Sequence, residues 1–133
     1  MADVGIENQE LVVAHLGHWP AFHDAEIVSM FFERAEPGYW PVITLRIEAV
    51  AGFDKTAGTP AKHFLVELQF AGVHDYELNG FNHQNAVFSL GFARENALII
   101  CDIEPSYGVS GYIESERVLV RSVTLLDGAF PRQ

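Results

Sequence analysis

The chain has few basic residues, a single cysteine and no long apolar run, and each of these shortages excludes a class of protein. Its 133 residues include eight lysines and arginines against 18 aspartates and glutamates, which gives a formal net charge of −10. Such a surface repels phosphate groups and anionic lipids, so nucleic-acid and membrane-surface partners are disfavoured. It attracts a basic partner and can speed its association by electrostatic steering. The alternative is acidity that serves solubility alone.

The other shortages bear on compartment and chemistry. A single cysteine, Cys101, excludes an intrachain disulfide, fits the reducing cytoplasm and lies in an apolar run that predicts burial. No apolar run reaches the roughly 18 residues of a membrane-spanning helix, and the acidic N-terminus lacks the pattern of a signal peptide. The chain has no recognisable phosphate-binding glycine loop or nucleophile motif, so it indicates neither an enzyme nor a bound cofactor.

The apolar pattern predicts an α+β fold, with one N-terminal helix and a mainly antiparallel sheet of about six to eight strands. Helical spacing favours a helix over Asn8–Leu16 that ends at Gly17. Strict alternation then predicts half-buried strands, most clearly over 43–49 and 63–70. Short connections without a second helix favour antiparallel pairing. Further strands are expected over 26–34, 88–92, 97–103, 111–114 and 118–125.

The remaining segments are expected to be turns and ends. Turn residues stand at Pro37–Gly38 and in the loop 52–60. The polar segment 72–85 fits either a loop or a short strand near Tyr76 with a turn at Asn79–Gly80. We see no linker or repeat, so the length predicts a single domain over 1–133, with frayed ends at about 1–5 and 127–133.

The densest group of unusual residues lies between the predicted helix and the first strand. As a structural corner, it would pack its two aromatic side chains into the core while the proline fixes the entering chain. The aspartate would accept backbone N–H groups, and the histidine would bond an orphaned carbonyl. As an alternative, His23, Asp24 and Glu26 could hold a metal ion in a small metal-binding or hydrolytic domain. Alternation along a strand places His23 and Asp24 on opposite faces, which disfavours a compact site unless the backbone turns there. The group reads Trp19-Pro20-Ala21-Phe22-His23-Asp24-Ala25-Glu26-Ile27.

Outward-facing positions of the predicted strands indicate a second candidate site. If neighbouring strands align, their carboxylates form an acidic stripe bordered by aromatic side chains. Such a surface suits a basic protein, with aromatic anchors and charges that set the encounter rate. The alternative is a solvated sheet face with no partner. Asp102 and Glu104 also share one strand face, either as a pair of catalytic carboxylates or as its solvated side. The candidate partner-binding residues are Glu48, Glu67, Gln69, Asp75, Tyr76, Glu77 and Phe81.

The Trp-Pro-x-Phe-His-Asp-Ala-Glu-Ile motif resembles the immunity protein 50 family, small bacterial proteins encoded beside polymorphic toxins. Two later stretches fit more loosely, so that the resemblance runs over roughly residues 15 to 120. It implies an α+β fold and a non-enzymatic role, in which the protein binds and neutralises a cognate toxin inside the producing cell. Many such toxins are basic nucleases, and a net charge of −10 fits a basic partner. The later stretches are Gly80-Phe81-Asn82-x-x-Asn85 and Glu104-Pro105-x-x-Gly108-x-x-Gly111.

Overall fold

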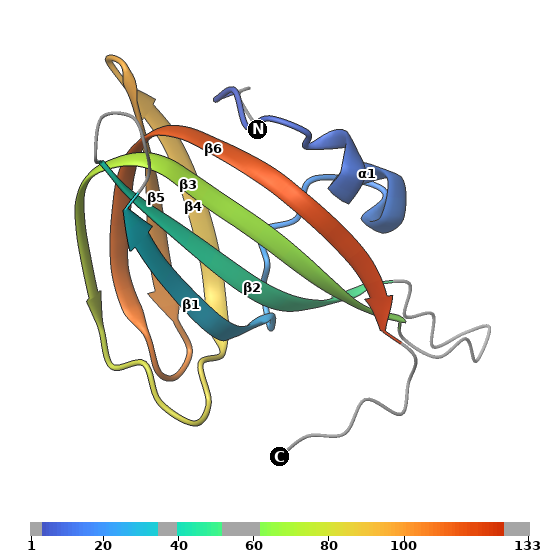
Figure 1. Cartoon of the computed structure of the whole chain (residues 1–133). Helices are drawn as coiled ribbons and strands as arrows, with labels where there is room; N and C mark the ends of the chain where they lie inside the picture. The colour runs from blue at the N-terminus through green and yellow to red at the C-terminus, as the bar shows by residue number, and fades with distance from the viewer. Residues whose placement is uncertain (1–3, 35–39, 52–61, 127–133) are drawn as a thin grey trace.

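The computed structural model describes residues 4–34, 40–51 and 62–126, which form one short helix followed by six strands (Figure 1). All paired strands run antiparallel, in the order β1-β2-β3-β6-β5-β4. The predicted α+β class, with one N-terminal helix and a mainly antiparallel sheet, is therefore confirmed. The elements are α1 (Glu10–Leu16), β1 (Glu26–Arg34), β2 (Pro41–Ala51), β3 (Lys62–Asn79), β4 (Val87–Glu95), β5 (Leu98–Pro105) and β6 (Ser110–Leu126).

The helix α1 contacts β6 and buries one face against the core. Val12 is fully buried and Leu16 packs against the core, as the apolar spacing predicts. The helix ends at Gly17, whose left-handed backbone (φ 86°) lets its N–H donate to the Val13 carbonyl. It begins two residues later than predicted because Asn8 itself has a positive φ of 61°. Residues before the helix are tied to β6, where a parallel bridge joins Glu7 to the sheet.

The two longest strands differ from the prediction. The sequence predicts a strand that stops near Phe70, whereas β3 continues for 18 residues. It likewise predicts two separate strands within β6, which is one strand of 17 residues. Irregularities in the β3–β6 register, at Glu67/Leu68 and at Val73/Asp75, allow both strands to bend without losing their pairing. Up to Phe70 the buried residues of β3 are even-numbered, whereas beyond the bend the buried residue is Val73. This change breaks the strict alternation from which a strand is predicted.

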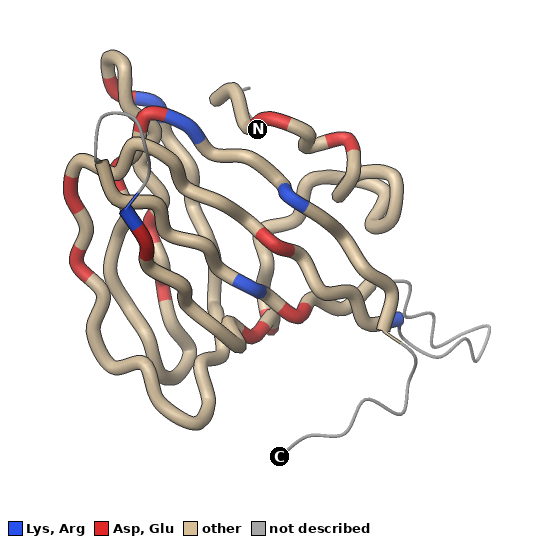
Figure 2. The backbone as a smooth tube through the Cα atoms, viewed as in Figure 1, with Lys and Arg blue, Asp and Glu red and all other residues tan. Residues whose placement is uncertain are grey.

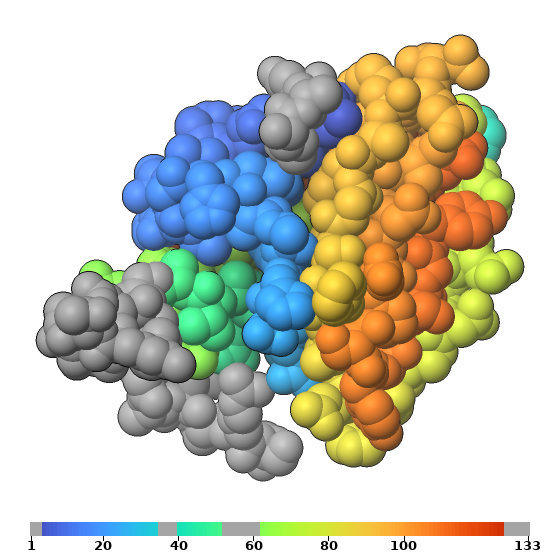
Figure 3. All heavy atoms as spheres, turned by 180° about the vertical axis from the view of Figure 1, so that it is seen from behind, coloured from blue at the N-terminus to red at the C-terminus, as the bar shows by residue number. Residues whose placement is uncertain are grey.

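The sheet curls until its two ends meet, and the core fills the space inside. The segment before β1 runs along β4, with Asp24 N–H donating to the Val87 carbonyl at 2.9 Å and Val87 N–H donating to the Ala25 carbonyl at 2.8 Å. Figure 3 shows this segment packed beside β4 on the far side of the molecule. The predicted turn at 37–38, the loop 52–60 and the tail 127–133 lie outside the described residues.

Candidate functional site

The motif between α1 and β1 forms a corner of the fold. Phe22 is buried at 2% exposure, and the Trp19 ring lies edge-on to it, with centroids 5.6 Å apart. Trp19 also packs edge-on against Phe92 of β4. Phe22 and Asp24 both have left-handed backbones, with φ of 62° and 66°, and these two residues turn the chain into β1. Both aromatic side chains therefore pack against the core, as the corner interpretation predicts.

The polar side chains of the corner point to different partners. His23 Nδ1 donates to the Phe88 carbonyl at 3.0 Å, as predicted. Contrary to the prediction, the Asp24 carboxylate accepts no backbone N–H group from the described residues. It is 79% exposed and lies 3.5 Å from His23 Nε2. The reason is that the Asp24 backbone itself bonds β4, which leaves the side chain facing solvent. Glu26 instead accepts from the Asn85 N–H. The described part of the chain contains no group of three or more His, Cys, Asp or Glu side chains arranged to hold a metal ion.

The three stretches that carry the family resemblance meet at the buried side chain of Asn85. This side chain is 3% exposed and makes four hydrogen bonds. Its Oδ1 accepts from the N–H groups of Asn82 at 3.0 Å and Val109 at 3.2 Å. Its Nδ2 donates to the carbonyls of Asn82 at 2.9 Å and Ile27 at 3.3 Å. We call these four bonds the Asn85 network; it joins the start of β1 to two turns at the place where the curled sheet closes.

At two glycines of the same stretches, a neighbouring backbone segment lies too close to leave room for a Cβ atom. Gly108 has φ 92°, and a Cβ there would collide with the Gln84 carbonyl oxygen. Gly111 has φ 140°, and a Cβ would overlap the Glu77 carbonyl oxygen of the neighbouring strand β3. Glycine alone fits both positions without displacement of the backbone. Most of the resemblance therefore lies in residues that hold the fold together. The sequence did not predict this role of Asn85 because two of its partners, Ile27 and Val109, are remote in the chain.

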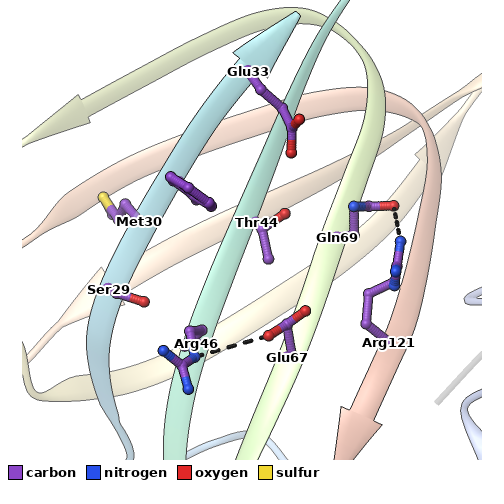
Figure 4. Close-up of a pocket in the computed structure, with 9 residues that line it drawn as sticks. Ser29, Met30, Glu33, Thr44, Arg46, Glu67, Gln69 and Arg121 are labelled. Atoms are coloured by element: carbon purple, nitrogen blue, oxygen red, sulfur yellow. Dashed lines mark hydrogen bonds and ion pairs between the residues drawn. The ribbon is translucent and has the colours of Figure 1, made fainter. Parts of the chain in front are cut away.

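The outer face of the β1-β2-β3-β6 part of the sheet carries an open hollow of about 500 Å³ (Figure 4). Its charges are mixed, because Arg46 lies 3.8 Å from Glu67 and Arg121 donates to Gln69 at 3.3 Å. It also holds Ser29, whose buried Oγ has no hydrogen-bond partner among the described residues. This half of the predicted stripe is therefore balanced in charge rather than acidic.

Glu48, a further member of the predicted stripe, is withdrawn from the surface. Its side chain is buried at 9% residue exposure, and its Oε2 lies 3.0 Å from Nδ1 of His63. A carboxylate that is already buried and paired within its own sheet offers little to an incoming protein. The structure thus places Glu48 in a side-chain pair of the fold.

The other half of the stripe lies on a separate, acidic face. Beyond the β3 bend, Asp75 and Glu77 face outward and pair with Glu114 and Tyr112 of β6. Figure 2 shows the acidic positions along this half of β3. The Tyr112 hydroxyl donates to Asp75 at 2.8 Å, and this bond raises the pKa of Tyr112. Burial and the negative charges of Asp75, Glu77 and Glu114 raise it further, which indicates a negative potential over this face.

Tyr76 points to the opposite side of β3 from Asp75 and Glu77. It pairs with the buried Ile113 and so lies at the margin of the core-facing side, 45% exposed. Its ring lies 5.6 Å from that of Phe32 in β1, itself 47% exposed. Phe81 is exposed in the segment that follows β3. The seven predicted residues therefore do not form one stripe, because the bend in β3 separates them into distinct surfaces.

In β5, the Cys101 thiol lies on one side of the sheet and the carboxylates of Asp102 and Glu104 lie on the other. Cys101 is fully buried, and burial, with a smaller contribution from Asp102, raises the pKa of its thiol far above the usual range. A thiol in that environment is a poor nucleophile. Asp102 and Glu104 are both exposed on the outward side of β5. They extend the acidic face begun by β3 and β6.

The curled antiparallel sheet and the helix α1 define a small α+β protein. A family model described as Immunity protein 50 matches residues 8–126. The chain belongs to the Immunity protein 50 family. No curated protein and no solved structure matched the chain. Within the described residues, no helix has the length and apolar character needed to cross a membrane.

Proposed function

We propose that this chain is a non-enzymatic immunity protein of the cytoplasm, which binds a cognate bacterial toxin and neutralises it by occupying its surface. The observation that carries the proposal is the family match over 8–126. The net charge of −10 favours a basic toxin, because opposite charge accelerates encounter and disfavours wrong partners. Nucleic acid and membranes are disfavoured as partners for the same electrostatic reason.

Three of the histidine side chains make hydrogen bonds that belong to the fold. His23 bonds the backbone of β4, while His63 and His74 pair with carboxylates at 3.0 and 2.7 Å. None of these bonds connects a histidine to a serine, threonine or cysteine within the described residues, which is the pairing that activates a hydroxyl or thiol nucleophile. Each instead ties two parts of the sheet together.

A stoichiometric titration tests the proposal. The purified chain is added in steps to the toxin encoded beside its gene, and the remaining toxin activity is measured. We expect activity to fall linearly and to end at one equivalent, because a protein that acts by occupancy is used up. An unrelated acidic protein of similar net charge is the control and should leave the activity unchanged. Complete inactivation by a small fraction of an equivalent would indicate an enzyme, and full activity at excess would refute the proposal.

A further inference from the structure

The distal half of β3, which we call the β3 edge (Val73–Asn79), has a strand partner on one side only within the described part of the chain. β2 pairs with β3 no further than Phe70, whereas β6 continues beside β3 to Asn79. Figure 1 shows this half of β3 at the outer margin of the curled sheet. An edge strand presents backbone N–H and C=O groups that another extended chain can pair with.

The remaining strand edges are less suited to a charged partner. The start of β4 is covered by the segment before β1, where Leu90 N–H donates to the Ala21 carbonyl at 2.9 Å. β1 likewise has a strand partner on one side only among the described residues, β2, but the end of its sequence carries one charge of each sign, Glu33 and Arg34, rather than carboxylates alone. The β3 edge carries two carboxylates and neither lysine nor arginine.

The two faces of the β3 edge differ in chemistry. Asp75 and Glu77 point outward, and the neighbouring strands continue the negative charge with Glu114. Tyr76 points to the other side and meets Phe32, so two half-exposed rings form an apolar contact there. A strand added along this edge would place alternate side chains beside the carboxylates and beside the rings. The complementary segment therefore alternates basic and apolar residues.

A second copy of the chain fits this edge poorly. Edge-to-edge pairing of two copies would bring the carboxylates of Asp75 and Glu77 close to those of the other copy, and like charges across strands are destabilising. The net charge of −10 on each copy adds to the repulsion. A basic chain experiences neither repulsion and is attracted by the same carboxylates.

We propose that the β3 edge is the toxin-docking site, and that it binds an extended segment of the toxin with alternating basic and apolar residues. The inference rests on the proposed function. In this arrangement the backbone of β3 supplies pairing, Tyr76 and Phe32 act as anchors, and Asp75 and Glu77 select a basic partner.

Binding of a catalytically inactive form of the neighbouring toxin to the wild-type chain and to four variants, Tyr76→Ala, Glu77→Lys, Glu95→Lys and Phe31→Ala, tests the inference. Tyr76→Ala removes an anchor and should weaken binding by about 30-fold or more, the range of interface hot spots. Glu77→Lys should weaken it by about 10-fold or more, chiefly through slower association, and the loss should shrink as salt rises. Glu95→Lys makes the same change of charge at the exposed tip of the β4–β5 hairpin and should stay within about 2-fold of wild type.

Backbone pairing gives an independent readout that does not depend on any variant. Amide exchange measured residue by residue should show alternate N–H groups of the β3 edge protected when the toxin binds. Pairing along one side of a strand engages every second residue, which distinguishes it from general coverage. Denaturant unfolding of each variant checks that it folds, and the exposed position of Glu77 keeps that variant usable if Tyr76→Ala is unstable.

The outcomes separate the inference from the function on which it rests. If the wild-type chain does not bind the toxin, both fail. If it binds while Tyr76→Ala and Glu77→Lys bind equally well, the edge is refuted and the immunity function stands. Loss of binding in Phe31→Ala alone would place the toxin at the hollow beside β1 instead. If the wild-type chain forms a dimer in solution and Glu77→Lys alters that dimer, the edge pairs with a second copy of the chain. This result would likewise overturn the inference.

Discussion

Asn85→Ala is expected to destabilise the protein by about 3–5 kcal/mol, because a single buried side chain makes four hydrogen bonds where the sheet closes. Two of its partners, the Val109 N–H and the Ile27 carbonyl, belong to residues with at most 1% exposure. Each buried group left without a partner costs about 1–3 kcal/mol. The two bonds to Asn82 add less, because that residue is exposed and water can replace them.

Urea unfolding followed by tryptophan fluorescence measures this change. With a slope of roughly 1.5 kcal/mol per molar urea for a chain of this size, the midpoint should fall by about 2–3 M. Asn82→Ala is the matched control, since among the described residues its side chain bonds only the nearby Gly80 carbonyl and Gln84 N–H and should contribute about 1 kcal/mol. An Asn85→Ala variant within about 1 kcal/mol of wild type would refute the role assigned to the Asn85 network.

Three further predictions concern strand packing, pH and thiol reactivity. Gly111→Ala should prevent folding or cost more than about 3 kcal/mol in thermal unfolding, because its Cβ would overlap a β3 carbonyl. Gly91→Ala, with open space around it, should change stability by less than about 1 kcal/mol, and an equal effect would contradict the packing argument. Arg117 donates two bonds of 2.7 Å to Glu7 and lowers the pKa of that carboxyl. A lowered folded-state pKa adds stability above the unfolded value of about 4.3 and loses it as pH falls through the folded value. In denaturant unfolding, the free energy of unfolding of Arg117→Gln should therefore be lower than that of wild type at pH 6, by less than about 1 kcal/mol because the pair is so exposed. In acid the two values should converge, and a difference that persists there would contradict this. Cys101 should react with a thiol reagent only at the rate of unfolding, because burial raises its pKa; rapid labelling of the native protein would contradict its burial.

Local periodicity allowed much of the fold to be read from the sequence. The alternation over 43–49 and 63–70 predicted two strands that the structure contains within β2 and β3, and the predicted strand over 26–34 coincides with β1. Gly17 ends the helix as expected, because a left-handed backbone is a local property of glycine. These predictions succeeded since each depends on neighbours a few residues away in the chain.

The same reasoning failed where a strand bends. Between Phe70 and Asn79 the register shift moves the buried position to Val73, so the pattern reads as polar and irregular. The predicted acidic stripe divides at this bend, with Glu67 beside arginine in the hollow and Asp75 on the acidic face. No spacing rule along one strand can foresee this, because the bend is compatible with pairing only when β6 bends with it.

By itself, the sequence determined the fold class, most strand positions, the acidic balance and the family resemblance, all of which are written in local patterns or in totals. Only the tertiary structure decided which residues share a surface. It gathered Asn85, Ile27 and Val109 into one hydrogen-bond network. It also placed Asp75 and Glu77 where β3 has a strand partner on one side only among the described residues, with Tyr76 on the other face. The physical reason is that register and curl are set by pairing between strands far apart in the chain, whereas periodicity records only which side of a strand is buried.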